Sequence, residues 1–413
     1  MKRVLSVILA AALLALLPAA CKAEKSKEKS EASASEAATT QAAATEAPAE
    51  DSGGTHPLYF KDSTKSEKAV ATFFNSLSGE STDVEMVKTG EDDSGVTFRC
   101  EGDCSAYNMV YVTCGDKKSK RFAFNKCVSG WYQTEPELMP YIEGGSVDPN
   151  PKYDDITLPY GEDEKTVHIW KPADYDPASA EAYDTIYVLD AQSLVISWAE
   201  SIENKDCPII TDVQAMTAVT GRKAIVVVVE TLRRNYELVP KIADFSPERT
   251  GENEFEAPEG EQLSAFFVNT LVPYVRSNYN VSTEAVHTSV LGASLSGITS
   301  FYLALENPTV FGTAGAMSPS FPIYESAGLD AYIAQKTFDS SAPLMYFYTG
   351  PAEFDTEPFV TEMAQRLKSN GYPADKIVLH YDSDGAHGGF FWRGTYSEFL
   401  TAMVFRQVKP LQG

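Results

Sequence analysis

Three residues in the C-terminal half of the chain have types and an order that suit nucleophilic catalysis. Ser294 lies in "LGASLSGITS" (291–300), Glu353 in "GPAEFD" and His387 in "DGAHGGFFW". A serine hydroxyl becomes a strong nucleophile when an imidazole accepts its proton, and a carboxylate then orients the imidazole and stabilises its cation. The order serine, acid, histidine therefore predicts a hydrolase-type site.

A nucleophilic serine at a sharp strand-to-helix turn usually lies in the pattern G-x-S-x-G. The sequence around Ser294 departs from this pattern. Ser296 occupies the last position and Gly297 follows one residue late. Residues two before and two after the nucleophile pack together at such a corner, so small side chains are the requirement. A serine adds only a hydroxyl, which can bond to a nearby carbonyl in the first helical turn. We therefore expect a working turn.

The base and the acid differ in how well the sequence defines them. Of the five histidines, only His387 lies in a glycine-flanked loop after a predicted strand. The other four lie near the N-terminal tether or within strand-like segments: His56, His168, His287 and His380. For the acid, Glu353 is preferred, and Asp355 remains the alternative.

The elements that must position these residues are predicted between about 150 and 409. Strands are expected at 185–191, 224–231, 287–294, 312–318, 344–350 and 377–383, and helices at 259–279, 295–307, 357–371 and 395–407. The run "VVVV" without alternation fits a strand covered on both faces, as in a parallel sheet. The alternation of strands and helices predicts a doubly wound, mostly parallel α/β sheet with reactive residues at the C-terminal ends of its strands.

Residues 55–147 have a different character. Strand-like segments follow a possible short amphipathic helix at 69–77, and four cysteines occur: Cys100, Cys104, Cys114 and Cys127. In an exported chain, four cysteines predict two disulfides with three possible connectivities. Their spacing does not resemble a common zinc finger, and Cys207 is left as a buried thiol. We expect a small, β-rich, disulfide-containing domain of unknown role.

The first residues resemble an export signal. Lys2 and Arg3 precede the apolar run 4–17, and "PAAC" ends at Cys21. Small residues before a cysteine resemble a bacterial lipoprotein cleavage site, so we expect a signal peptide at 1–20 and lipidation of Cys21. An ordinary secretory signal is the alternative. Residues 21–54 lack large apolar side chains and predict a disordered tether. The protein would be extracytoplasmic and lipid-anchored, or secreted.

The net charge of the chain makes some classes of binding partner unfavourable. The formal charge of the chain is −24 at pH 7. An acidic surface repels phosphate backbones, so we expect no nucleic-acid partner and contact with a membrane only through the N-terminal lipid.

Residues 150–409 resemble the putative esterase family of α/β-hydrolases, which includes esterase D, enterochelin esterases, feruloyl and acetyl-xylan esterases and mycolyltransferases. The resemblance rests on "IYVLDAQ", "RRNYELVP", "FFVNTLVPYVRSNYNV", "VLGASLSGITSFYLALENPTVFGTAGAMSPSF" and "GAHGGFFW". It implies an α/β-hydrolase fold with Ser294 as nucleophile, His387 as general base and Glu353, or Asp355, as the acid.

Further roles follow from this fold and this resemblance. Backbone N–H groups of Leu295 and Gln192 are expected to form the oxyanion hole. Arg234 and Trp392 are candidates for substrate binding, and a structural ion pair is the alternative role of Arg234.

The predicted function is a serine carboxylic-ester hydrolase that acts outside the cell through an acyl-enzyme, with no metal or organic cofactor. Its substrate would be a small-molecule or polysaccharide-linked ester, such as a feruloyl or acetyl group on plant polysaccharide or the ester backbone of a siderophore. Two alternatives remain: an acyltransferase that uses the same triad, and a non-catalytic carbohydrate- or siderophore-binding lipoprotein on a hydrolase scaffold.

Overall fold

The computed structural model describes residues 54–126, 130–133, 138–140, 147–148, 151–190, 208–250, 255, 257–353 and 356–407. All of them belong to one compact unit, Thr45–Gly413. Five residues with predicted roles or pairings lie outside the described residues: Cys21, Cys127, Gln192, Cys207 and Asp355. The predicted signal peptide and nearly all of the tether lie outside as well.

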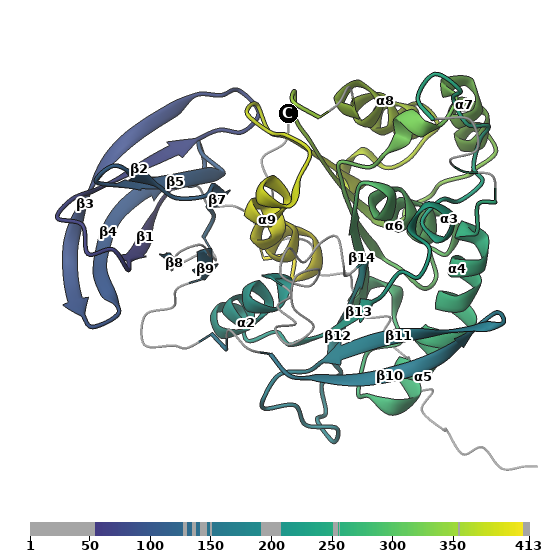
Figure 1. Cartoon of the computed structure of the whole chain (residues 1–413), viewed down its shortest axis with the longest axis horizontal. Coiled ribbons are helices and arrows are strands. Elements are labelled where there is room, and N and C mark those ends of the chain that lie inside the picture. The colour runs from purple at the N-terminus through teal and green to yellow at the C-terminus, as the bar shows by residue number, and fades with distance from the viewer. Residues whose placement is uncertain are drawn as a thin grey trace, which may run out of the picture. The chain divides into compact units, whose positions relative to one another are not determined.

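An eight-stranded sheet carries the predicted site residues (Figure 1). Its strands, in spatial order, are β10 (Tyr153–Tyr160), β11 (Asp163–Trp170), β13 (Ala224–Val229), β12 (Asp184–Leu189), β14 (Thr288–Ala293), β15 (Thr313–Met317), β16 (Leu344–Thr349) and β17 (Ile377–Tyr381). The pairs β10–β11 and β11–β13 are antiparallel, and the others are parallel. Every residue of β12, β13, β14 and β15 is buried, as expected for strands covered on both faces. The prediction of a mostly parallel sheet is confirmed.

Helices cover both faces of this sheet (Figure 1). One apolar cluster packs α4 (Gly260–Phe266), η1 (Phe267–Leu271), α5 (Val272–Asn278), α6 (Leu295–Glu306), α7 (Ser326–Ala334) and α8 (Thr356–Ser369) against one face. A second cluster packs α2 (Pro208–Thr220), α9 (Gly389–Glu398) and η5 (Phe399–Val404) against the other. The described chain also contains short helices: α3 (Arg234–Glu237), η2 (Ala285–His287), η3 (Phe321–Ile323) and η4 (Ala374–Lys376).

The N-terminal region forms a second sheet. In spatial order its strands are β6 (Lys117–Lys118), β5 (Met109–Cys114), β2 (Ala69–Phe74), β3 (Ser81–Asp92), β4 (Gly95–Asp103), β1 (Thr55–Asp62), β8 (Gly130–Gln133) and β9 (Leu138–Pro140), and β7 (Phe122–Ala123) pairs with β5. All neighbours are antiparallel except β1 and β8.

The short helix expected at 69–77 is wrong, because Ala69–Phe74 is strand β2. Its residues alternate between buried and half-buried up to Phe73, and the strand is paired on both sides, with β3 and β5. An alternating run of β-branched and aromatic residues between two partners is more stable as a strand than as an isolated short helix.

The prediction of two disulfides is also wrong in this structure. Cys100, Cys104 and Cys114 are buried, and none of the three forms a disulfide. Two disulfides among the four cysteines would need at least one between two of these three. Burial raises the pKa of the Cys100 and Cys114 thiols to about 12, so both stay protonated and behave as small core side chains.

The apolar core joins the two sheets. The cluster that contains α2 and α9 also includes Phe60 and Phe122 of the N-terminal sheet, together with Ile186 and Val226 of the eight-stranded sheet. Among the described residues, no helix is long and apolar enough to span a membrane.

Candidate active site

Ser294 lies at the corner between β14 and α6. It has φ 60° and ψ −121°, a conformation that non-glycine residues rarely adopt. The backbone around it is held by the last residue of β15 and by the turn after that strand, because the Ser294 N–H donates to the Met317 carbonyl at 2.9 Å and the Ser320 N–H donates to the Ser294 carbonyl at 3.2 Å. Strain of this kind is retained where the surroundings fix it, and it is concentrated at functional sites.

The residues on either side of Ser294 leave no room for larger side chains. A Cβ atom on Gly292 would lie 2.2 Å from the Ser296 carbonyl oxygen, and one on Gly297 would lie 2.9 Å from the Met317 carbonyl oxygen. The buried Ser296 hydroxyl accepts from the Ala293 N–H at 2.8 Å and donates to the Ala293 carbonyl at 2.7 Å. It therefore ties the helix start to the end of the strand, rather than to the first helical turn as expected.

Leu295 is the first residue of α6. N–H groups in the first turn of a helix have no acceptor within the helix, and the helix dipole adds partial positive charge at this end. This placement suits a donor to an oxyanion. Gln192, the second expected donor, lies outside the described residues. The Ser294 hydroxyl lies 3.1 Å from the Ser320 hydroxyl.

Glu353 and His387 approach each other from the ends of neighbouring strands. Glu353 follows β16 and is 1% exposed, and its Oε2 lies 3.6 Å from Nδ1 of His387, which follows β17. The His387 side chain is 19% exposed. Because Nδ1 faces the carboxylate, Nε2 is directed to the opposite side of the ring. Asp355, the alternative acid, lies outside the described residues.

Ser318 connects the acid to the aromatic residue after the histidine. The Trp392 indole Nε1–H donates to the Ser318 hydroxyl at 2.7 Å, and that hydroxyl donates to Glu353 Oε1 at 2.7 Å. The Trp392 ring lies edge-on to the His387 ring, with 5.1 Å between centroids. Trp392 was expected to bind substrate, but it is buried and its polar atom contacts Ser318, so this position suits the orientation of His387 instead.

The sequence did not point to Ser318 as a site residue. The only signal was its place at the end of a predicted strand, in "MSPSF". Like Ser294, it has a positive φ, 44°. Its side-chain contacts join residues 35 and 74 positions away.

Arg234 forms a structural ion pair, which is the alternative role that the sequence allowed for it. Its Nε donates to Asp190 Oδ2 at 2.7 Å, and Asp190 is 2% exposed at the end of β12. Asp190 has φ 55°, so this ion pair stabilises a strained turn beside the sheet edge. The nearby Glu237 is fully buried and pairs with Lys165.

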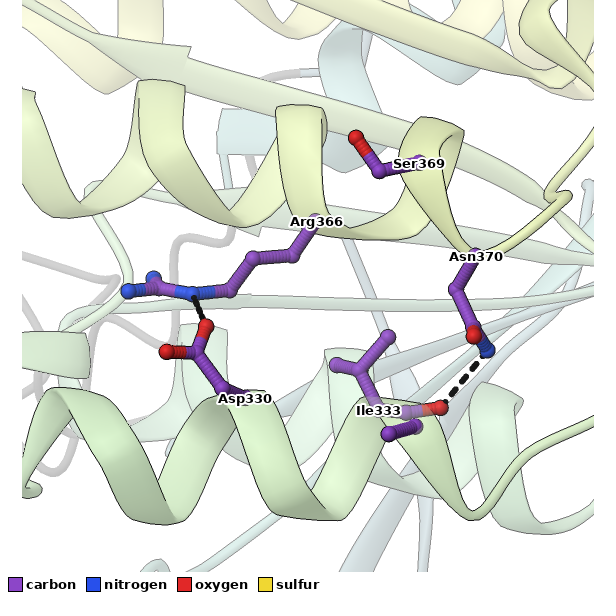
Figure 2. Close-up of a pocket in the computed structure, with 6 residues that line it drawn as sticks. Asp330, Ile333, Arg366, Ser369 and Asn370 are labelled. Atoms are coloured by element: carbon purple, nitrogen blue, oxygen red, sulfur yellow. Dashed lines mark hydrogen bonds and ion pairs between the residues drawn. The ribbon is translucent and has the colours of Figure 1, made fainter.

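A cavity of about 210 Å³ lies between α7 and α8, apart from these residues. Figure 2 shows two hydrogen bonds among the residues that line it: Arg366 Nε donates to Asp330 at 2.5 Å, and the Asn370 side chain donates to the Ile333 carbonyl at 2.7 Å. None of the predicted site residues lines it.

One curated protein matches part of this chain in sequence. Protein YbbA of Bacillus subtilis, which is uncharacterised, is 25% identical over 127 residues, or 29% of this chain and 50% of that protein. The chain thus spans about half the length of that relative.

Solved structures also match. The siderophore hydrolase EstA from Aspergillus nidulans is 16% identical, with 62% of this chain and 95% of that chain covered and a TM-score of 0.50, and it shows the fold. The enterobactin esterase FES from Shigella flexneri is 16% identical, with 84% of this chain and 92% of that chain covered and a TM-score of 0.45.

A model of the putative esterase family matches residues 160–372, just over half of the chain. This range contains Ser294 and Glu353 and ends 15 residues before His387. The chain therefore belongs to the putative esterase family, which confirms the predicted resemblance.

Proposed function

We propose that the protein hydrolyses carboxylic esters through an acyl-enzyme formed on Ser294. The observation that carries this proposal is the strained backbone of Ser294 at the C-terminal end of β14, held by hydrogen bonds with the end of β15 and the turn after it. A serine at such a corner projects its hydroxyl beyond the sheet edge, where the loops after β16 and β17 bring Glu353 and His387 together.

The reaction would proceed in two balanced steps. His387 Nε2 accepts the hydroxyl proton while Ser294 Oγ bonds to the ester carbonyl carbon, and the backbone N–H groups of Leu295 and Gln192 stabilise the oxyanion. The tetrahedral intermediate collapses, the alcohol leaves and takes its proton from His387, and the acyl group stays on Ser294. Water then attacks the acyl group with His387 again as base, releasing the acid and the free serine.

Glu353 would keep His387 in the tautomer that presents Nε2 to Ser294. The distance of 3.6 Å to Nδ1 is compatible with this role, because catalytic hydrogen bonds are often longer in free enzymes than in reaction complexes. The Ser318 hydroxyl fixes the other carboxylate oxygen and so restricts the rotation of Glu353.

For the substrate, we propose a feruloyl or acetyl ester of a polysaccharide, or the ester backbone of a siderophore. For the location, we propose a lipid anchor at Cys21 and a tether over 21–54, which would hold the enzyme outside the cell. The apolar run 4–17 followed by small residues before Cys21 supports the anchor.

Hydrolysis of a short chromogenic ester by the purified protein tests the mechanism. Ser294→Ala should lower kcat by roughly 10³–10⁶-fold. Ser320→Ala is the matched control, since it removes a neighbouring hydroxyl and should change kcat far less. Turnover that is unaffected by Ser294→Ala would exclude Ser294 as the nucleophile, whereas absent turnover would favour a binding role.

Two further measurements define the substrate and the location. Rates on feruloyl, acetyl and catecholate-trilactone esters should differ by orders of magnitude, and product analysis with an alcohol acceptor present separates hydrolysis from acyl transfer. Mass analysis of the chain from membranes should show a lipid-modified N-terminal cysteine, whereas a soluble product that begins elsewhere would contradict the anchor.

A further inference from the structure

The loop that carries His387 is attached to the N-terminal region of the chain. We call residues 54–126 the N-terminal module and residues 382–388 the base loop. Arg121 of the module forms an ion pair with Asp382, the first residue of the base loop. Their side chains are 9% and 1% exposed, so the pair is almost fully removed from water.

Asp382 connects the base loop to the end of the neighbouring strand β16. Its N–H donates to the Thr349 carbonyl at 2.8 Å, and its Oδ2 accepts from the Tyr348 hydroxyl at 3.2 Å. Within the loop, its Oδ1 accepts from the Asp384 N–H at 3.2 Å, and its carbonyl accepts from the Gly385 N–H at 2.7 Å. Asp382, whose negative charge Arg121 balances, is therefore the residue on which most of these hydrogen bonds of the base loop converge.

The far end of the base loop meets the segment that carries the acid. The Ala352 N–H donates to the Gly385 carbonyl at 3.0 Å, and Ala352 forms a parallel bridge with Ala386. Ala352 directly precedes Glu353, and Ala386 directly precedes His387. A shift of Asp382 is thus transmitted over a few bonds to both members of the acid–base pair.

The module holds the base loop and the start of α9 at further points. The Ser383 N–H donates to the Ser76 carbonyl at 2.9 Å. The Arg121 guanidinium lies over the Phe391 ring at 5.9 Å, one residue before Trp392. A Cβ atom on Gly394 would lie 2.6 Å from the Arg121 carbonyl oxygen, so glycine at this position permits α9 to approach the module closely.

We propose that Arg121 of the N-terminal module is a positioning residue, which acts through Asp382 to hold His387 against Glu353. The proposal rests on the proposed function, in which these two residues serve Ser294. Without Arg121, the Asp382 carboxylate would be buried without its counter-charge and would draw water into the loop.

The effect on catalysis should be a loss of turnover rather than of binding. Displacement of His387 by a fraction of an ångström weakens proton transfer in the transition state, whereas Arg121 itself contacts Asp382 and the rings of Phe74 and Phe391. The expected signature is a lower kcat with a nearly constant KM.

The test compares variants of the purified full chain. Arg121→Met keeps the length of the side chain and removes its charge, Arg121→Lys keeps the charge, and Asp382→Asn keeps the shape of its partner. Asn125→Ala is the matched control: it removes a hydrogen bond of 3.1 Å from the module to Thr401 in η5, outside the base loop. Steady-state kinetics are measured at a temperature at which every variant is folded by circular dichroism, with Ser294→Ala as reference.

Arg121→Met should lower kcat by roughly 10–100-fold with KM within about threefold, and Arg121→Lys should recover much of the loss. Asn125→Ala should retain wild-type kcat. The double variant of Arg121→Met and Asp382→Asn should lose little more than either single variant, because both act through one contact.

Wild-type kcat in a folded Arg121→Met variant would overturn the proposal, as would an equal loss in Asn125→Ala. If Arg121→Met does not fold, the same comparison is made with Arg121→Lys and Asp382→Asn, and wild-type kcat in both would overturn it. Turnover that does not depend on Ser294 would instead refute the proposed function, so the two failures are distinct.

Discussion

The nucleophile corner (292–297) and the base loop (382–388) both follow the C-terminal ends of strands of one sheet, but they are held in different ways. The corner is fixed by residues three or four positions apart and by the neighbouring strand, through Gly292, Ser296 and the Met317 carbonyl. The base loop is fixed by Arg121, 261 positions earlier in the chain. One half of the proposed site is therefore encoded locally, and the other half depends on a separate part of the chain.

The two segments are also held by different kinds of interaction. Steric exclusion holds the corner, because no atom larger than hydrogen fits on Gly292. A buried charge pair and backbone hydrogen bonds hold the base loop. Steric constraints are insensitive to pH and salt, whereas charge pairs are sensitive to the ionisation of their neighbours. The following variants should separate these two modes.

The largest effect is expected from Gly292→Ala in the corner. The new methyl group would lie 2.2 Å from the Ser296 carbonyl oxygen, so the backbone must shift. We expect kcat to fall by about 10²-fold or more, and the free energy of unfolding to fall by about 1–3 kcal/mol. Kinetics and urea unfolding measure both. Gly90→Ala, where the methyl group would meet nothing within 4 Å, is the control. Normal activity in Gly292→Ala would show that the corner is not held sterically.

The next effect is expected from Ser318→Ala, which tests the hydrogen bonds behind the acid. It removes the donor to Glu353 and the acceptor of the Trp392 N–H, so each loses a buried partner. Because a net hydrogen bond is worth about 0.5–1.5 kcal/mol, kcat should fall up to about tenfold, with KM nearly unchanged. Thr313→Val in β15, the strand that ends just before Ser318, is the control, since the Thr313 hydroxyl is buried without a hydrogen-bond partner. Equal kinetics in the two variants would contradict the role of Ser318.

A smaller, pH-dependent effect is expected from His380, which lies on β17 just before the base loop. Burial lowers the pKa of His380, but the buried Glu398 carboxylate on α9 more than offsets this and raises it above its usual value of 6.5. The stability from this pair is therefore fully present below about pH 6.5 and is lost as pH rises through the folded-state pKa.

His380→Gln keeps a hydrogen-bond donor but does not titrate. The difference in free energy of unfolding between wild type and this variant should fall with rising pH, by at most about 1.4 kcal/mol per pH unit. Urea unfolding between about pH 6 and pH 9 measures it. A constant or growing difference would show that His380 is neutral in the folded protein.

The smallest effect is expected from Ser296→Gly, which restores the common corner motif. It removes two hydrogen bonds to Ala293 but adds no steric conflict, so kcat should stay within about twofold and the free energy of unfolding should fall by about 1 kcal/mol. Ser296→Val should behave like Gly292→Ala, because Ser296 is fully buried. If Ser296→Gly lost most of its activity, the hydroxyl itself would have a catalytic role.

The sequence predicted what is decided by near neighbours. The strands with continuous apolar runs and the helix after Ser294 could both be predicted from patterns a few residues long. The segment 69–77 could not, because its apolar residues fit a helix as well as a strand, and pairing with β3 and β5 decides between them.

The remaining errors and omissions concern contacts between distant segments. The cysteines of the N-terminal module suggested disulfides from composition alone, but the fold places Cys100, Cys104 and Cys114 as separate core thiols. The hydrogen-bond and ion-pair partners of Ser318, Arg121 and Arg234 likewise depend on which strands end next to one another in the folded protein. No local pattern shows that Arg121 lies beside Asp382, because that contact exists only once both sheets have formed.

The Arg121–Asp382 pair also bears on the order of events during synthesis. Chains are made from the N-terminus, and early regions can fold before later ones emerge. Residues 54–126 are complete long before Asp382 exists, whereas contacts of such long range form slowly because a large loop must close. The module would thus serve as a template for the last strand and its loop, and a newly made chain would gain catalytic competence only at the end of its folding.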